Sequence, residues 1–307
     1  MRTFVISASA PATVANVGPG FDVFGFALDG PCDTVEIRRV SRRGVRLLEI
    51  VGADDLPLSS SKNVASAVAA KMLRAANTKF GIEMILKKGL PLGSGLGSSS
   101  ASAVAAAVAT NRLLGERFSD PELLDFARYG EKVACGAAHA DNVAAALFGG
   151  FIIVRGEEVI RLAVSKQWRV VVAHPHFVLP TKKARAVLPS RVPLSATTTN
   201  VAHAAALIAA IYKKDLALFG RAVMGDAVVT PARKRLIPGF DSVHCAALDA
   251  GAVGVSISGA GPSVFALTDT DNHAKLVARK IIAAWRRHGI ASDVFVSRIG
   301  ATGALGR

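Results

Sequence analysis

The sequence predicts an α+β protein with two domains, and three observations support that expectation. The chain has 307 residues, a length at which two domains are the ordinary expectation. Apolar residues make up 51 % of it, which is enough for a sizeable core and argues against disorder. Strand-like and helix-like segments are mixed without strict βαβ alternation, which favours α+β over a doubly wound sheet. The boundary is expected near residues 157–167, so that one domain covers residues 1–160 and the other residues 161–307.

The first third of the chain is expected to contribute mainly strands. Runs rich in β-branched residues predict strands at residues 3–10, 34–39 and 45–51. Residues 11–30 contain several glycines and prolines and are interpreted as a long connection, which is usually functional or mobile. A helix at residues 63–76 and a short strand at residues 82–86 follow.

Residues 91–97 are interpreted as a loop, and an alanine-rich helix is expected over residues 98–114. Gly115 can end that helix in a left-handed cap. The next helix begins with a capping box, Ser119 to Glu122 with Pro121 in the first turn, and should run to about residue 135.

The second half alternates between the two kinds of element. Strands are expected at residues 151–154, 158–162, 169–173, 253–258, 263–268 and 293–298. Helices are expected at residues 182–187, 197–212, 216–224, 241–250 and 272–288. The last strand is a candidate to return to the first domain, so the boundary is approximate.

The formal charge of +14 admits two interpretations, a nucleic-acid partner or an anionic small ligand such as a nucleotide. Five arginines cluster between residues 38 and 46, and the other basic residues are scattered. No basic run is interleaved with aromatic residues, and aromatic residues form only 6 % of the chain. Nucleic acid is therefore not expected as the main partner, and most of these charges are interpreted as a solvated face.

The cysteines and the hydropathy pattern indicate a cytoplasmic protein. Cys32, Cys135 and Cys245 are odd in number and far apart, which argues against a disulfide framework and a structural zinc site. The apolar run before residues 8–10 is too short for a signal peptide. The longest uncharged apolar stretch, residues 143–154, is too short to span a bilayer, so no membrane association is expected.

The most informative segment is rich in glycine and serine. Three glycines at alternate positions allow the backbone to curl and to approach a ligand closely. Serines follow where a helix begins, and a helix start exposes unpaired N–H groups that attract anions. The candidate phosphate loop consists of Pro91, Leu92, Gly93, Ser94, Gly95, Leu96, Gly97, Ser98, Ser99, Ser100 and Ala101.

The better-known phosphate motifs do not fit this segment. A Walker A loop requires a lysine that does not follow Gly97, and a dinucleotide fingerprint requires glycine where Ser98 stands. A flexible turn capped by serine is the remaining structural alternative.

With these motifs in view, the chain resembles the GHMP kinase superfamily. The phosphate loop, residues 11–22 (PATVANVGPGFD) and residues 258–263 (SGAGPS) are similar to its three motifs. Within the superfamily the closest resemblance is to the homoserine kinases, because residues 16–22 lack the lysine of mevalonate-type kinases. Residues 139–143, 181–185 and 231–240 also resemble homoserine kinase segments. Ser100 stands where Ala or Gly is common, a soft departure.

The resemblance implies a ribosomal-protein-like α/β domain followed by a ferredoxin-like C-terminal domain. It implies ATP and Mg²⁺ as cofactors and L-homoserine as the acceptor, with O-phospho-L-homoserine as the product in threonine biosynthesis. Family members are often homodimers. The alternatives are another GHMP kinase, acting on mevalonate, shikimate or a sugar, and a basic nucleic-acid-binding protein.

The resemblance also implies roles for individual residues. Ser99, with Ser98 as the alternative, and Glu131 would hold Mg²⁺. Asp22 would meet the acceptor's ammonium group, with Asn16 and His139 nearby, and the acceptor's carboxylate would lie between Arg185 and Arg233. Asn142 would position the acceptor hydroxyl, while the role of Asp141 stays open. Without the resemblance, Glu131 reads as an exposed helix carboxylate, and Asp141 and Asn142 read as a helix N-cap.

Overall fold

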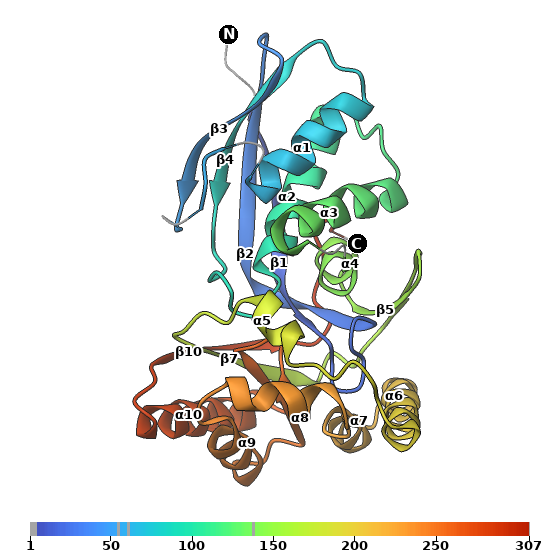
Figure 1. The fold of residues 1–307 in the computed structure, drawn as a ribbon, viewed down its shortest axis with the longest axis vertical. Coiled ribbons are helices and arrows are strands. Elements are labelled where there is room, and N and C mark those ends of the chain that lie inside the picture. Colours follow the sequence, from blue (N-terminus) through green and yellow to red (C-terminus); the bar gives the residue numbers. More distant parts are fainter. Residues whose placement is uncertain (1–4, 54–55, 60–61, 137–138, 307) are drawn as a thin grey trace.

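The computed structural model describes residues 5–53, 56–59, 62–136 and 139–306, so residues 3 and 4 of the first predicted strand lie outside the described residues. Two sheets organise the described chain. Figure 1 shows them in two stacked halves, each with helices packed on its sheet. The α+β class expected from the sequence is thereby confirmed.

The first sheet is built around one long strand. Strands β1 (Ile6–Ala15), β2 (Phe24–Val40), β3 (Gly44–Val51), β4 (Gly81–Lys87), β5 (Phe151–Arg155) and β6 (Glu158–Leu162) form it. The order is β3-β4-β2-β5-β6, and β1 also pairs with β2. Among the described strands of this sheet, β3 and β4 pair in parallel and the other pairs are antiparallel.

The predicted connection at residues 11–30 is wrong over much of its length. Strand β1 continues to Ala15, and β2 already begins at Phe24. Antiparallel pairing between these strands overrides the glycine and proline content, with a register shift between Pro11 and Thr13. Gly25 lies within β2, where an added Cβ would come within 2.6 Å of the Asp141 carbonyl oxygen. The glycine therefore serves a close approach between a strand and a helix.

Four helices belong to the first half: α1 (Val64–Ala75), α2 (Ser98–Leu113), α3 (Asp120–Cys135) and α4 (Asp141–Phe148). Helix α2 packs on β1 and β2 and against α1 and α3. Small side chains allow this, since all six of its alanines are fully buried. Both predicted helix ends are confirmed: Gly115 has φ +74°, and Ser119 and Glu122 form the capping box.

The second sheet has four antiparallel strands in the order β10-β7-β9-β8. These are β7 (Arg169–Pro175), β8 (Gly254–Ile257), β9 (Val264–Thr268) and β10 (Ser292–Arg298). The helices of this half are α5 (Thr181–Ala186), α6 (Leu194–Lys213), α7 (Leu216–Val223), α8 (Val229–Arg233), α9 (Phe240–Asp249) and α10 (Asp271–Arg287), and a 3₁₀ turn, η1 (Lys234–Leu236), follows α8.

Alternate residues of β7 belong to different cores. Val170 and Val172 lie in the core of the first half, whereas Val171 and Ala173 lie in the core formed with α9 and α10. The second sheet therefore separates the core of the first half from the core formed with α9 and α10, and Figure 1 shows β7 and β10 in this position. After β10 the chain runs back along α4, where the Ala304 N–H donates to the Ala146 carbonyl at 2.8 Å.

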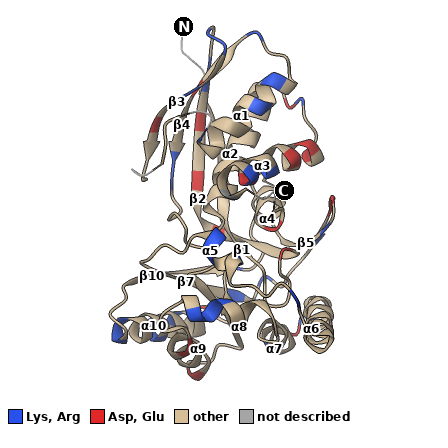
Figure 2. Ribbon diagram, viewed as in Figure 1, with Lys and Arg blue, Asp and Glu red and all other residues tan. Residues whose placement is uncertain are grey.

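Charged residues are distributed over both halves (Figure 2). Part of the arginine cluster is neutralised within the sheet, because Arg38 and Arg46 both pair with Glu83. Arg39 stacks over the Phe80 ring, 4.1 Å from its centroid. This cluster lies around the β2–β3 turn.

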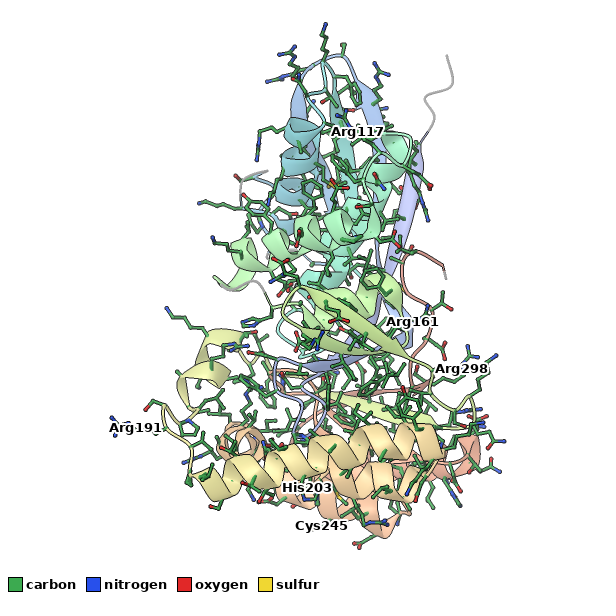
Figure 3. All side chains as sticks on the ribbon, turned by 90° about the vertical axis from the view of Figure 1, so that its right-hand side faces the viewer. Arg117, Arg161, Arg191, His203, Cys245 and Arg298 are labelled. Carbon is green, nitrogen blue, oxygen red and sulfur yellow. The ribbon has the colours of Figure 1, made fainter. Side chains whose placement is uncertain are left out.

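Helix α6 lies on the outside of the second half, where Figure 3 labels His203 on it. Among the described residues it is the one helix that is long and apolar enough to cross a membrane by length and composition alone. A single helix of this kind is weak evidence for a membrane span, because helices of soluble proteins pass the same test.

Candidate active site

Most of the predicted site residues line one cavity of about 350 Å³ between the two halves. Its walls come from the phosphate loop, the starts of α2 and α4, the end of α3, and the α5 and α8 segments. The predicted residues that line it are Asn16, Asp22, Leu92, Gly93, Ser94, Gly95, Gly97, Ser98, Ser99, Ser100, Glu131, His139, Asp141, Asn142, Arg185 and Arg233. Three predicted residues do not: Leu96 and Ala101 are fully buried, and Pro91 lines a separate shallow cavity.

The phosphate loop is curled by its three glycines. Gly93, Gly95 and Gly97 have φ values of +59°, +78° and +69°, the left-handed region that glycine adopts without strain. Gly97 is the N-cap of α2, and it has no side chain to satisfy the first N–H groups of that helix. Those donors and the helix dipole are directed at the cavity, which suits a phosphate group.

The loop is held from the second half by the glycine-rich segment 258–263. The Ser258 hydroxyl donates to the Gly95 carbonyl at 2.8 Å, and the Ser263 N–H donates to the Ser94 carbonyl at 3.2 Å. A Cβ at Gly95 would come within 2.4 Å of the Ser258 carbonyl oxygen. The expected packing of this segment on the phosphate loop is present, and the segment is also the β8–β9 hairpin turn.

The serines that follow the loop divide into two groups. The Ser99 and Ser100 hydroxyls donate to Glu131 Oε1 at 2.6 and 2.8 Å. The Ser98 hydroxyl instead donates to the Leu90 carbonyl at 3.4 Å and accepts from Lys88 at 2.8 Å. A hydroxyl and a carboxylate at the start of α2 are the hard oxygen donors that a divalent cation prefers. Ser99 therefore fits the metal role better than Ser98, because its hydroxyl lies beside the Glu131 carboxylate whereas that of Ser98 is bonded to Leu90 and Lys88.

The same cavity also contains an ion pair between Asp22 and Arg185. Arg185 Nη2 donates to Asp22 Oδ1 at 2.6 Å and lies 3.2 Å from His139 Nδ1. Arg185 Nε and His139 Nε2 are buried without a hydrogen-bond partner among the described residues. Burial lowers the pKa of His139, and Asp22 opposes that shift. A neutral histidine and an incompletely bonded guanidinium are suited to receive a polar ligand.

Asn16 is hydrogen-bonded to the backbone of Asp22. Its side-chain carbonyl accepts the Asp22 N–H at 2.9 Å, and its amide donates to the Gly259 carbonyl at 2.9 Å. Both residues have left-handed backbone, with φ +58° in each. Asn16 therefore fixes the backbone on which the Asp22 carboxylate is presented.

Arg233 is almost wholly buried, with 1 % of its surface exposed. It donates to the carbonyls of Ala184 and Gly259 at 3.1 and 2.9 Å. Burial, with a smaller contribution from Arg185, lowers its pKa to about 10, so the group stays charged at neutral pH. Phe21 lies beneath both guanidinium groups, 5.1 Å from that of Arg185 and 5.2 Å from that of Arg233. Sequence analysis did not single out this aromatic contact.

Asp141 and Asn142 begin α4 beside the phosphate loop. Asn142 Oδ1 accepts the Thr13 hydroxyl at 2.7 Å, and Gly97 lies so close that a Cβ there would be 2.9 Å from the same oxygen. Burial, reinforced by the nearby Asp22, raises the pKa of Asp141 to about 7. Its Oδ1 accepts the Asn142 N–H at 2.9 Å. The N-cap of α4 is Ala140 and no side chain caps the helix, so the alternative in which Asp141 or Asn142 is the N-cap is wrong.

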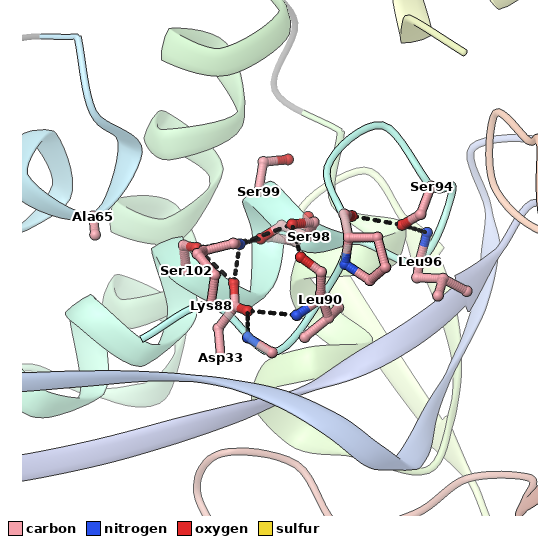
Figure 4. Close-up of polar contacts among 12 residues, drawn as sticks. Asp33, Ala65, Lys88, Leu90, Ser94, Leu96, Ser98, Ser99 and Ser102 are labelled. Atoms are coloured by element: carbon pink, nitrogen blue, oxygen red, sulfur yellow. Dashed lines mark hydrogen bonds and ion pairs between the residues drawn. The ribbon is translucent and has the colours of Figure 1, made fainter. Parts of the chain in front are cut away.

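Sequence analysis missed the buried pair of Lys88 and Asp33, which Figure 4 shows beneath the loop. A signal for it exists in the strand alternation. Val35 and Ile37 face the core from β2, and two residues earlier on the same face stands Asp33. Met84 and Leu86 face the core from β4, and Lys88 continues that series. A charge at an inward position of each strand predicts a buried pair.

Comparison with known proteins supports the same fold. A model of the GHMP kinases N terminal domain matches residues 63–150, and one of the GHMP kinases C terminal region matches residues 207–287. A homoserine kinase of Chlorobaculum tepidum is 44 % identical and covers 97 % of each chain, and one of Xylella fastidiosa is 40 % identical, covering 97 % of this chain and 92 % of its own. The crystal structure of homoserine kinase from Cytophaga hutchinsonii superposes with a TM-score of 0.95 at 45 % identity, over 99 % of this chain and 97 % of that one. The L. major mevalonate kinase shares the fold at 15 % identity, with a TM-score of 0.76 over 97 % of each chain.

Proposed function

Because this chain belongs to the GHMP kinases and, among them, to the homoserine kinases, it is an ATP-dependent kinase that acts on an alcohol group, and we propose a division of roles for its site. Its acceptor is L-homoserine, and its product is O-phospho-L-homoserine, in threonine biosynthesis. The observation that carries the proposal is the Asp22–Arg185 pair, which lines the same cavity as the phosphate loop. A carboxylate beside a guanidinium complements the two charges of a free amino acid.

The phosphate loop binds ATP in this proposal. Its glycine backbone and the uncapped N–H groups of α2 donate hydrogen bonds to the phosphate oxygens. Ser99 and Glu131 would hold Mg²⁺, which when bound neutralises charge on the phosphates that face the acceptor. Phosphoryl transfer depends mainly on positioning and charge stabilisation, so no covalent intermediate with the protein is required.

The acceptor binds by exchanging partners with the ion pair. Its ammonium group takes the Asp22 carboxylate, and its carboxylate takes Arg185 together with Arg233. Each charged group of the protein thereby gains a new partner as the internal pair separates, so that neither is left buried and unpaired. His139 lies next to Arg185 and Asp22, and it adds the free Nε2 of a neutral imidazole.

Asn142 positions the acceptor hydroxyl next to the phosphate loop. Its side-chain oxygen accepts a hydrogen bond from Thr13 beside Gly97. This bond fixes the orientation of the amide group and leaves its N–H groups as the donors. Asp141 is one residue away, and its pKa of about 7 would let it take up a proton near neutral pH. Its carboxylate accepts the Asn142 N–H, so we assign Asp141 to orienting Asn142 and leave direct proton transfer to the phosphate oxygens.

An acceptor screen with ATP and Mg²⁺ tests this function. Homoserine should be phosphorylated, while mevalonate and shikimate, which lack the ammonium group, and a simple sugar should not. The sharpest control is homoserine with its amine acetylated, which keeps the hydroxyl and the carboxylate but loses the charge that Asp22 requires. Equal turnover of mevalonate and homoserine would contradict the proposed acceptor.

The setting of the enzyme is also proposed. Cys32 and Cys245 are free thiols, which supports a reducing cytoplasm. A homodimer follows from the family resemblance, and sedimentation equilibrium measures it. Neither a membrane nor nucleic acid has a role in the proposed reaction.

A further inference from the structure

An ion pair lies buried beneath the phosphate loop, outside the roles described so far. The Lys88 and Asp33 side chains are 1 % and 0 % exposed, and their ammonium and carboxylate groups are in direct contact. The strands β2 and β4 pair Thr34 with Lys87, and continuing that register by one residue places Asp33 opposite Lys88. The pair is thus set by the sheet itself and not by a mobile side chain.

The two partners hold opposite ends of the phosphate loop. Asp33 Oδ1 accepts the N–H groups of Gly89 and Leu90, at 3.0 and 3.2 Å, where the chain enters the loop. Lys88 donates to the carbonyl and the hydroxyl of Ser98, at 3.0 and 2.8 Å, where the chain leaves it. Figure 4 shows both sets of contacts converging beneath the loop.

Ser102, one turn further along α2, closes the network. Its hydroxyl donates to Asp33 Oδ2 at 2.7 Å and accepts from Lys88 at 2.9 Å. The pair therefore connects three segments: strand β2, the entry to the loop, and the first turn of α2. Burial lowers the pKa of Lys88, and Asp33 counteracts this shift.

We propose that the Lys88–Asp33 pair is a positioning element of the ATP site, which fixes the spacing between the two ends of the phosphate loop. The proposal rests on the proposed function, since it assigns the pair to nucleotide binding. Lys88 and Asp33 act through the loop backbone and through Ser98, so they are positioning residues and not catalytic ones.

A buried ion pair of this kind is better suited to positioning the loop than to stabilising the fold alone. Removing two charges from water costs about as much as their attraction returns, and buried pairs are often replaced by apolar residues without loss of stability. What such a pair does provide is one defined geometry, because its hydrogen bonds are directional and an unpaired partner is costly. A loop that is already shaped binds its ligand without paying the cost of ordering.

The test removes both charges together, in Lys88→Met with Asp33→Asn. The matched control is Lys87→Met with Glu36→Gln, which removes an ion pair between the same two strands on the exposed face. Steady-state kinetics with each substrate varied in turn, and calorimetric titration with ADP, give the readouts. The buried double variant should raise the KM for ATP and the Kd for ADP by about tenfold or more. The KM for homoserine should stay within about twofold in both double variants.

The outcomes separate the two proposals. If the unmodified protein binds no ADP and phosphorylates no homoserine, the proposed function fails. If it does both, and the buried double variant binds ADP as tightly as the control does, the positioning role is overturned. Equal losses for ATP and homoserine would also overturn it, because they would indicate a general structural role.

A milder variant decides the matter if the buried double variant does not fold. Ser98→Ala removes one of the two Ser98 groups that accept from Lys88, the hydroxyl, while it keeps the contact with the Ser98 carbonyl and leaves the buried charges balanced. It should raise the KM for ATP by about three- to tenfold, and Ser98→Thr, which restores a hydroxyl, should recover most of that loss. Unchanged ATP kinetics in Ser98→Ala would contradict the proposal.

Discussion

At the scale of single residues, the proposed site depends on two arginines that differ in how they are held. Arg185 is paired with Asp22, whereas Arg233 is fixed by two backbone carbonyls and is nearly inaccessible to solvent. Arg233 is therefore a rigid donor and Arg185 an exchangeable one. Their shared contact with Phe21 keeps the two like charges on one aromatic ring.

Arg185→Ala and Arg233→Ala should each lower kcat/KM for homoserine by about 10- to 100-fold, because a charge-assisted hydrogen bond contributes about 1.5–3 kcal/mol. The KM for ATP should stay nearly constant, since the phosphates bind at the loop. Lys should substitute poorly for either, because it cannot make the bidentate contact. Steady-state kinetics check this, and the two losses should be less than additive. Intact homoserine kinetics, or equal damage to ATP binding, would rule out the carboxylate clamp.

Phe21→Leu should reduce kcat/KM for homoserine by about 5- to 30-fold, since two cation–π contacts of about 0.5–1 kcal/mol each would be lost. Phe21→Trp keeps an aromatic face and is the matched variant, with an expected loss smaller than that of the leucine. Kinetics with homoserine varied at saturating ATP measure both. If the leucine and tryptophan variants behave alike, the ring acts only by filling space.

At the scale of elements, helix α2 shows how one helix end can be functional and the other merely structural. Gly97 precedes α2 and Gly115 follows it, and both have positive φ, +69° and +74°. An added Cβ at Gly97 would come within 2.1 Å of the Thr13 hydroxyl, whereas one at Gly115 would meet nothing within 4 Å. The pair therefore separates backbone strain from loss of space.

Gly97→Val should abolish ATP binding while circular dichroism still shows a folded protein. The β-branched side chain would displace Thr13 and Asn142 and would occupy the space next to the phosphates. Gly115→Val carries the same kind of backbone strain and should bind ATP normally. Calorimetric titration with ATP compares them, and unchanged affinity in a folded Gly97→Val variant would refute the loop assignment.

Helix α3 offers a similar comparison for the metal. Glu131→Gln should reduce kcat by about 100-fold or more at ordinary Mg²⁺, with partial recovery at high Mg²⁺, because a carboxamide is a poorer ligand than a carboxylate. Asp125→Asn, on the same helix with 72 % of its side chain exposed, is the control and should change nothing. Near-normal activity of Glu131→Gln would reject this role.

How far the sequence predicted the elements depended on whether local pattern and tertiary pairing agreed. The capping box of α3 and the glycine after α2 are local signals, and both were predicted. Residues 11–30 carry turn residues but lie largely in β1 and β2, because strand pairing outweighs local propensity. Helix α8 has only five residues, too few for a periodic pattern, although it presents Arg233. The cavity residues came from motif resemblance, and Phe21 and Lys88 were missed because their partners are distant in sequence.

At the scale of the whole molecule, Asp141 should make stability depend on pH. Its folded-state pKa of about 7 lies above the usual value of 3.8. The folded protein therefore binds more protons than the unfolded chain between these values, and the free energy of unfolding contributed by this group falls as pH rises from about 4 to 7. Asp22, Glu131 and Arg185 are the charged neighbours that set this shift together with burial.

Asp141→Asn removes the titrating group but keeps an acceptor for the Asn142 N–H. The free energy of unfolding of this variant, taken relative to that of the unmodified protein, should be higher at pH 8 than at pH 5. The expected increase is roughly a few kcal/mol, since one pKa unit corresponds to about 1.36 kcal/mol. Denaturant unfolding at the two pH values measures the difference. A difference that is the same at both pH values would show that Asp141 does not titrate in this range.

The shared sheet has a consequence for how the molecule moves. Strand β7 contributes side chains to both cores, and Phe26 of β2 meets Phe265 of β9 edge-on within one of them, with 6.0 Å between the ring centroids. Rotation of the two halves about a hinge would therefore break apolar contacts. Motion during turnover is expected instead in thin peripheral segments. Helix α5 is such a segment, six residues long with Ala184 as its one buried residue, and it carries Arg185. The two halves would then stay fixed relative to each other during turnover, and helix α5 would move when Arg185 exchanges Asp22 for the substrate.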